Sequence, residues 1–265
     1  MSHEFKPARY LYWGMRGVVR VLTVPFRPLP EGKAKAAVRR FILTFQHSLP
    51  TEFAVSRGDT VVQIGTPRPR TMARFRRAVG AEGRLVIVEA MPDNQDRLAA
   101  AIAAYGFTNV TLIRAAACNE NRMGELAISP YIGDHKIDLD HIRMDNDLRP
   151  GNAAMEKIPV RFVRLDDELP QHGVERIDYL SVTVNGAEGE VLKGAAETLR
   201  RSGPGTRVYA KGHALDSAGR PLHLETQAIM QGLGYRTKIT RGEPSSTTDS
   251  SWRWRAGDLF AWKEW

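Results

Sequence analysis

The sequence lacks the features that mark secreted or membrane-spanning proteins. It contains one cysteine, Cys118, in 265 residues, so neither a disulfide framework nor a cysteine-rich zinc site is expected. It has no apolar run followed by a small-residue cleavage site, and therefore no signal peptide pattern. We expect a cytoplasmic protein, in a reducing compartment.

An excess of positive charge is also missing from most of the chain, although the formal net charge is +8. Residues 1–42 contain nine Lys or Arg and two Glu, whereas the remaining residues contain 29 basic and 28 acidic side chains. The body of the chain is therefore nearly neutral, which argues against a domain-wide nucleic-acid surface. Its 42% hydrophobic residues are enough for a sizeable core.

The basic N-terminal segment has a helical pattern. Four arginines, Arg9, Arg16, Arg20 and Arg27, are spaced so that they fall on one stripe of a helix. Charges inside the run and its short length argue against a membrane span. We predict that residues 1–50 are a basic amphipathic helical extension. Its residues 9–27 would dock on a protein partner, or on an anionic membrane surface as a peripheral protein.

From Asp59 onward, strand-like apolar runs alternate with helical patterns. The predicted strands are residues 60–65, 84–90, 109–117, 176–184, 206–212, 235–240 and 258–264. The predicted helices are the stretch after Pro69 and residues 92–106, 186–203 and 223–234. Repeated β-α units indicate an α/β fold with a parallel sheet covered on both faces. The last two strands have no helix between them, so we expect them to form an antiparallel hairpin at one edge.

The turn after the first strand has few glycines for a nucleotide-binding loop. The segment VVQIGTPRPR (61–70) keeps Gly65, but prolines and arginines follow it. A nicotinamide-binding loop needs two further glycines, which argues against a nicotinamide-dependent enzyme. Gly65 still ends a strand, and Glu89 ends the next strand, where a carboxylate can accept two ribose hydroxyls. The pair predicts a nucleotide-type cofactor at the carboxyl edge of the sheet.

Five segments, in chain order, are similar to one known family. They are VVQIGTPRPR, GRLVIVEAMPDNQDRL, NVTLIRAAACNENRMGELAI, VRFVRLDDEL and RIDYLSVTVNGAEGEVLKGA. On these segments, residues 60–213 resemble the FkbM-type S-adenosylmethionine-dependent methyltransferases. The resemblance implies a class I methyltransferase domain over residues 51–265, with a Rossmann-like, doubly wound, mostly parallel sheet. It also implies S-adenosylmethionine as cofactor and O-methylation of a hydroxyl on a sugar, glycolipid or natural product.

The resemblance further implies which residues contact the cofactor. These are Gln63, Gly65, Thr66, Glu89, Ala116 and Asn185. The chain departs from the family at several of its ionic positions. The family has an acidic residue at position 63 and Lys, Asp and Glu at positions 181, 183 and 185, where this chain has Gln63, Ser181, Thr183 and Asn185. Two interpretations remain: a divergent enzyme, or a methyltransferase-like subunit without catalysis that serves as a binding or assembly module.

Methyl transfer to a hydroxyl benefits from a general base, because a hydroxyl is a poor acid. His213 follows the predicted strand 206–212 and Glu188 lies early in the predicted helix 186–203, so both are candidate catalytic residues. Glu188 has the alternative role of complementing the helix dipole. The His/Asp pairs of the middle loop are further candidates.

The middle segment GDHKIDLDHIRMDND (133–147) contains five Asp and two His. It lacks the glycine and the terminal glutamate of a calcium loop and has no paired histidines, so we predict no metal site. We interpret residues 130–157 as a lid-like insertion over the active-site face. In that lid, Arg143, Arg149 and His141 are expected to meet an anionic or sugar acceptor.

Overall fold

The computed structural model describes residues 55–65, 68–130, 135–137, 142–144, 155–212, 214–216, 222–239 and 257–264. The chain divides into residues 1–54 and residues 55–265, and all described residues belong to the second unit. The predicted N-terminal extension and much of the predicted lid therefore lie outside the described residues. So do the candidate residues Thr66, His141, Arg149 and His213.

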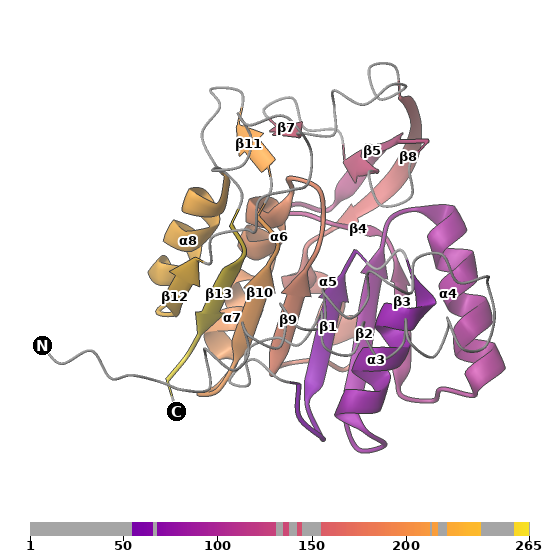
Figure 1. The fold of residues 1–265 in the computed structure, drawn as a ribbon, viewed down its shortest axis with the longest axis horizontal. Helices are drawn as coiled ribbons and strands as arrows, with labels where there is room; N and C mark the ends of the chain where they lie inside the picture. The colour runs from indigo at the N-terminus through magenta and orange to yellow at the C-terminus, as the bar shows by residue number, and fades with distance from the viewer. Residues whose placement is uncertain are drawn as a thin grey trace, which may run out of the picture. The chain divides into compact units, whose positions relative to one another are not determined.

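A seven-stranded sheet forms the centre of the described unit (Figure 1). Its strands are β1 (Thr60–Ile64), β2 (Arg84–Glu89), β3 (Val110–Arg114), β9 (Tyr179–Val182), β10 (Arg207–Ala210), β12 (Arg236–Ile239) and β13 (Leu259–Trp262). They lie in the order β12-β13-β10-β9-β1-β2-β3. β13 pairs antiparallel with both β10 and β12, whereas the other strand pairs of this sheet are parallel. The predicted sheet is confirmed, and the second strand of the hairpin lies inside it.

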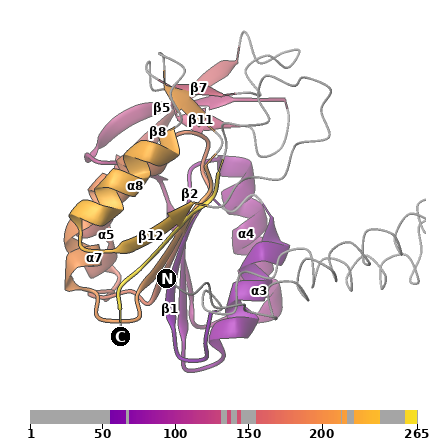
Figure 2. The same cartoon turned by 60° about the vertical axis from the view of Figure 1, so that its left-hand side comes forward.

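Helices cover both faces of this sheet, as predicted. They are α3 (Pro69–Val79), α4 (Pro92–Tyr105), α5 (Leu165–Gln171), α6 (Glu188–Gly194), α7 (Ala196–Arg201) and α8 (Leu222–Gly232). Figure 2 shows α3 and α4 on one face and α5, α7 and α8 on the other. The central strands are covered on both sides, which explains why β2 and β9 are almost continuously buried rather than alternating.

The limits of α4 follow from its sequence. Pro92 lies in the first turn, where a backbone N–H has no acceptor within the helix, so its lack of an N–H costs no hydrogen bond. Asp93, also in the first turn, complements the helix dipole. Gly106 ends the helix in the left-handed conformation, with φ of 62°. Its N–H donates to the carbonyl of Ala103, and the N–H of Phe107 donates to the carbonyl of Ile102. The predicted helix 186–203 is interrupted at Ala195 and becomes α6 and α7.

A second, four-stranded sheet lies beyond the carboxyl edge of the first (Figure 1). Its strands are β4 (Ala116–Ala117), β5 (Arg122–Ile128), β6 (Lys136–Ile137) and β8 (Glu156–Val163), in the order β4-β8-β5-β6. The sequence predicted one strand over residues 109–117, but the structure divides it between β3 of the first sheet and β4 of the second. The short strands β7 (Ile142–Met144) and β11 (Ala214–Asp216) pair antiparallel. The predicted lid thus contains β6, β7 and the start of β8.

Two apolar clusters hold these sheets together. The larger one lies on the face of the seven-stranded sheet that α5, α6, α7 and α8 cover. The smaller one packs the four-stranded sheet against the segment after β9, and it joins Ala116, Cys118, Leu126, Ile137, Val160, Phe162 and Ala187. The second cluster keeps the small sheet in a fixed place above the carboxyl edge.

Candidate functional site

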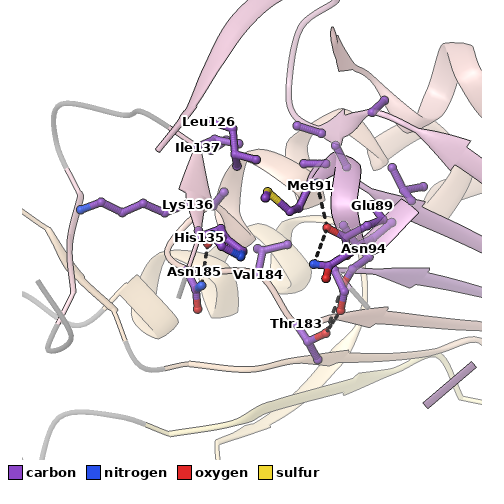
Figure 3. A pocket seen from close by; sticks show the side chains of 18 residues that line it. Glu89, Met91, Asn94, Leu126, His135, Lys136, Ile137, Thr183, Val184 and Asn185 are labelled. Atoms are coloured by element: carbon purple, nitrogen blue, oxygen red, sulfur yellow. Dashed lines mark hydrogen bonds between the residues drawn. The ribbon is translucent and has the colours of Figure 1, made fainter. Parts of the chain in front are cut away.

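A cleft lies between the carboxyl edge of the seven-stranded sheet and the four-stranded sheet (Figure 3). The empty space in and before it, counting the open solvent at its mouth, is about 630 Å³. Of the predicted cofactor residues, Gly65, Glu89, Ala116 and Asn185 line this cleft. Gln63 is not among the lining residues. Four motifs far apart in the sequence therefore meet at one place, as the prediction of a carboxyl-edge site requires.

Gly65 makes the turn from β1 and can only be glycine. Its φ is 74°, a backbone conformation that side chains disfavour, and a Cβ there would lie 2.6 Å from the carbonyl oxygen of Thr183. Its N–H donates to the carbonyl of Val88 at 2.9 Å. The turn is therefore fixed between β2 and the segment after β9, and a ligand can approach its backbone closely.

Gln63 lies beneath this turn, and its side chain forms hydrogen bonds with other groups of the protein. It is 1% exposed, and its Nε2 donates to the carbonyls of Ile64 (3.1 Å) and Gly65 (3.2 Å) and to Thr183 Oγ1 (2.9 Å). Thr183 Oγ1 in turn donates to the carbonyl of Gly65 at 2.6 Å. Among the described residues, Gln63 Oε1 has no hydrogen-bond partner. The two neutral side chains hold the turn from below, and a direct contact of Gln63 with the cofactor stays a prediction.

Glu89 ends β2 and is 6% exposed at the wall of the cleft. Its Oε1 accepts the Met91 N–H at 2.9 Å and the Asn94 Nδ2 at 3.4 Å (Figure 3). Gln95 Nε2 donates to the Glu89 carbonyl at 2.8 Å. The first turn of α4 thus orients the carboxylate. The sequence prediction missed Asn94, although its place in that turn was a usable signal.

Apolar side chains form the floor and the roof of the cleft beside Glu89. Ala115, Ala116 and Ala117 are small and buried, and they lie on one side. Leu126 and Ile137, from the four-stranded sheet, lie on another. A narrow apolar slot next to an oriented carboxylate suits a nucleoside, whose base is flat and whose ribose offers hydroxyls to the carboxylate. The roof was missed because the sequence prediction did not foresee the second sheet.

His135 and Asn185 meet in the cleft (Figure 3). The Asn185 Nδ2 donates to the carbonyl oxygen of His135 at 2.7 Å. The N–H of Ser129 donates to His135 Nδ1 at 3.1 Å. Because Nδ1 accepts that bond, the proton of the neutral ring is on Nε2, so this tautomer is a hydrogen-bond donor at Nε2. The arrangement argues against His135 as a base; His141 lies outside the described residues.

Glu188 begins α6, next to Ala187 of the cleft wall, and is 3% exposed. Burial raises the pKa of its carboxyl to about 8, and the nearby Lys211 ammonium opposes that rise. Its Oε1 has no hydrogen-bond partner among the described residues. Close by, the Tyr209 hydroxyl donates to Asp258 at 3.2 Å, and burial raises the pKa of Asp258 as well. Glu89 lines the cleft, whereas Glu188 and Asp258 are not among its lining residues.

Several other chemistries find no support in the part of the chain that the structure describes. It contains no group of three or more His, Cys, Asp or Glu that could hold a metal ion. None of its helices is long and apolar enough to cross a bilayer. Burial raises the pKa of the Cys118 thiol, which makes it a weak nucleophile.

The sheet order, the inserted antiparallel strand and the cleft at the carboxyl edge define a class I methyltransferase fold. Residues 63–237 match the family model described as the methyltransferase FkbM domain. This match spans more than half of the chain, and the chain therefore belongs to the FkbM methyltransferase family. S-adenosylmethionine is the cofactor of this class, and the turn at Gly65, the apolar slot and Glu89 fit such a nucleoside.

Solved structures with similar folds are distant in sequence. An O-methyltransferase from Bacillus cereus in complex with SAH is 12% identical, with a TM-score of 0.46 over 94% of this chain and 97% of that one. Fibrillarin from Aeropyrum pernix with natively bound S-adenosyl-L-methionine is 15% identical (TM-score 0.46, coverage 80% and 70%). Precorrin-6y C5,15-methyltransferase from Geobacter metallireducens is 11% identical (TM-score 0.44, coverage 90% and 91%). No curated protein sequence matches the chain.

Proposed function

We propose that this chain is an active methyltransferase that methylates a hydroxyl on a sugar, glycolipid or natural product. One observation carries the proposal: the Gly65 turn and the oriented Glu89 carboxylate face the same cleft. Both survive although several ionic positions of the neighbouring motifs have become neutral. A chain that had lost its cofactor would have no need to keep a buried, oriented carboxylate at this place.

The residues of the cleft have distinct roles in this proposal. Glu89 accepts the two ribose hydroxyls, and Asn94 and the Met91 N–H hold its carboxylate in position. Ala116 belongs to the floor on which the base lies. Gly65 lets the backbone come close to the cofactor because it has no side chain.

The acceptor lies, in this proposal, on the side of Glu188. When bound, S-adenosylmethionine supplies an electrophilic methyl group on a positively charged sulfur. The protein holds the acceptor oxygen in line with that methyl group, and positioning of this kind accounts for much of the acceleration. As the new C–O bond forms, the methyl–sulfur bond would break and leave S-adenosylhomocysteine, and the hydroxyl proton would go to a base. Glu188 is our candidate among the described residues, and His213 remains the other candidate.

Isothermal titration calorimetry with S-adenosylmethionine and S-adenosylhomocysteine tests the cofactor site directly. We expect both compounds to bind with a stoichiometry of one per chain. If neither compound releases or absorbs heat at millimolar concentration, the cleft does not bind the cofactor, and this result would contradict the proposal.

The pH dependence of turnover tests the role of Glu188. A carboxylate acts as a base only when ionised, so a pKa of about 8 makes the rate rise with pH up to that value and level off above it. The variant Glu188→Gln, of equal size, should be slower and should lose this inflection. The measurement is the initial rate of S-adenosylhomocysteine formation between pH 6 and pH 10. An unchanged rate and inflection would leave His213 as the base.

The second candidate is a subunit that binds without catalysis, and the neutral motif positions favour it. Gln63, Thr183 and Asn185 all bond to backbone carbonyls rather than present charge to the cleft. Such a subunit would act as an assembly module through residues 9–27, on an anionic membrane surface or a protein partner. Deletion of residues 1–30 should then abolish sedimentation with anionic vesicles or association with a partner and leave cofactor affinity intact. A truncated protein that does not fold would contradict this role.

A further inference from the structure

We propose that Asn185 is a positioning residue that holds β6 over the cofactor cleft through the backbone of His135, and that it is not itself a ligand of the cofactor. This inference rests on the cofactor cleft of the proposed function. Its starting point is the bond of 2.7 Å from Asn185 Nδ2 to the carbonyl oxygen of His135 (Figure 3). That bond joins the edge of the seven-stranded sheet to the four-stranded sheet.

The strand β6 needs such an anchor because it is very short. It consists of Lys136 and Ile137, which pair with Ala127 and Leu126 of β5. A ladder of two residue pairs is marginal by itself. Yet Ile137 forms part of the roof, so the shape of the cleft depends on where β6 lies.

His135, at the start of β6, is held from two sides. Its ring accepts the N–H of Ser129, which directly follows β5, and its carbonyl accepts the amide of Asn185. The first bond keeps it within the small sheet. The second bond ties β6 to the main sheet, and thereby sets the height of its part of the roof above Ala116 and Gly65.

Asn185 is well placed to act as a fixed point. Thr183, two residues earlier, bonds to the carbonyls of Ile64 and Gly65 at 3.1 and 2.6 Å. Val184 packs against both apolar clusters. The chain on the core side of the bond is therefore rigid, so the bond restrains β6 and not the reverse.

The identity of the side chain agrees with this role. A carbonyl oxygen needs a donor, and an amide has one whereas an ionised carboxylate has none. The Glu that the family resemblance places at position 185 would face the His135 carbonyl with two acceptors. The Asn at this position therefore matches the backbone group that it meets.

The variant Asn185→Asp tests the proposal, because it keeps the size and shape of the side chain but replaces the donor with a charged acceptor. Without ligand, the backbone amides of residues 135–137 should exchange hydrogen about tenfold faster than in the wild type, the effect of losing one hydrogen bond. S-adenosylhomocysteine should dissociate about tenfold faster, with little change in its association rate. Hydrogen exchange with mass spectrometry and stopped-flow binding give the two results.

His135→Ala is the matched control, since it removes the ring but keeps the carbonyl that Asn185 binds. Exchange at residues 136–137 should rise less in this variant than in Asn185→Asp. Asn185→Ala removes the donor without adding charge and serves if the aspartate variant does not fold. It should show the same local increase in exchange.

Two results would overturn the inference. Weaker binding of S-adenosylhomocysteine with unchanged exchange at residues 135–137 would make Asn185 a direct ligand. Unchanged exchange together with unchanged binding would mean that the bond from Asn185 to the His135 carbonyl does not restrain β6. If the wild type binds no S-adenosylhomocysteine, the proposed function fails, whereas the exchange comparison on unliganded protein still decides whether Asn185 restrains β6.

Discussion

The carboxyl ends of β1 and β2 lie side by side in the sheet but are built on opposite principles. At the end of β1, Gln63 and Thr183 are neutral and bond to each other and to the carbonyl of Gly65. At the end of β2, Glu89 keeps a carboxylate and the first turn of α4 orients it. The comparison teaches that shaping a loop and binding a ligand are separable tasks. The neutral side chains Gln63 and Thr183 suffice to shape the loop, whereas the ligand-binding end keeps the charged side chain of Glu89.

The neutral end contains two polar residues that face each other in the sheet. Gln63 and Ser181 are partners in the register of β1 and β9, and they replace the acid and the lysine that the family resemblance places there. Removing one member of a buried ion pair leaves an unpaired charge at a large cost, whereas losing both can be neutral. A charge at one of these two positions would therefore be costly without an opposite charge at the other.

The largest effect that we expect comes from putting a charge back at the neutral end. Gln63→Glu preserves the shape of the side chain, but its 1% exposed carboxyl would face the carbonyls of Ile64 and Gly65. It should stay protonated, which costs about 3–4 kcal/mol of unfolding free energy at pH 7 for a group that ionises near pH 4.3 when unfolded. Because its pKa is raised in the folded state, the loss should disappear as the pH falls to about 4. Urea unfolding at both pH values measures this.

The double variant Gln63→Glu with Ser181→Lys is the control, because it supplies the cation on the neighbouring strand. It should recover part of the lost stability at pH 7. A single variant as stable as the wild type at pH 7 would show that this end tolerates charge, and the contrast with β2 would lose its basis.

The turn between the two ends should show the next largest effect. Gly65→Ala forces a side chain into a left-handed conformation and against the Thr183 carbonyl, which should cost about 2–3 kcal/mol of unfolding free energy. Gly106→Ala is the matched control, since its φ is also positive and no heavy atom lies within 4 Å of the added Cβ. That variant should lose only about 1 kcal/mol. Equal losses would mean that the close approach to Thr183 is unimportant.

The charged end should show its effect in binding more than in stability. Glu89→Ala should weaken binding of S-adenosylhomocysteine by about 1–3 kcal/mol, as expected for the loss of a charged hydrogen-bond partner. Glu89→Gln keeps an oxygen for the Met91 N–H and should weaken binding less. Calorimetry on the three proteins measures the difference. Unchanged affinity in the alanine variant would show that Glu89 does not bind the ribose.

The sequence predicted the parts of the site that depend on residues close together in the chain. β1, β2 and α4 were expected from a buried run, a second buried run and a helix with Pro92 and Gly106 at its ends. Parallel pairing then brings Gly65 and Glu89 to the same edge by geometry alone. The positions of these two residues therefore followed from local rules.

The four-stranded sheet could not be predicted by the same rules. β5 pairs with β8, and this brings Arg122 opposite Phe162 across a long stretch of chain. β5 is mostly exposed at its start, and β6 has two residues, so neither shows a buried run. The roles of Asn94 and His135 depend on hydrogen bonds to Glu89 and Asn185 that residue spacing does not reveal.

The place of β13 has a consequence for how the protein is made. β13 follows every other strand of its sheet in the chain, yet it lies between β10 and β12. During synthesis, β10 and β12 therefore emerge from the ribosome before the strand that joins them, and each exposes an unpaired backbone edge meanwhile. β13, the last strand of this sheet to be translated, closes both edges at once. A nascent chain stalled before Leu259 would thus be most prone to aggregate through β10 and β12, even though its cofactor cleft has already been translated.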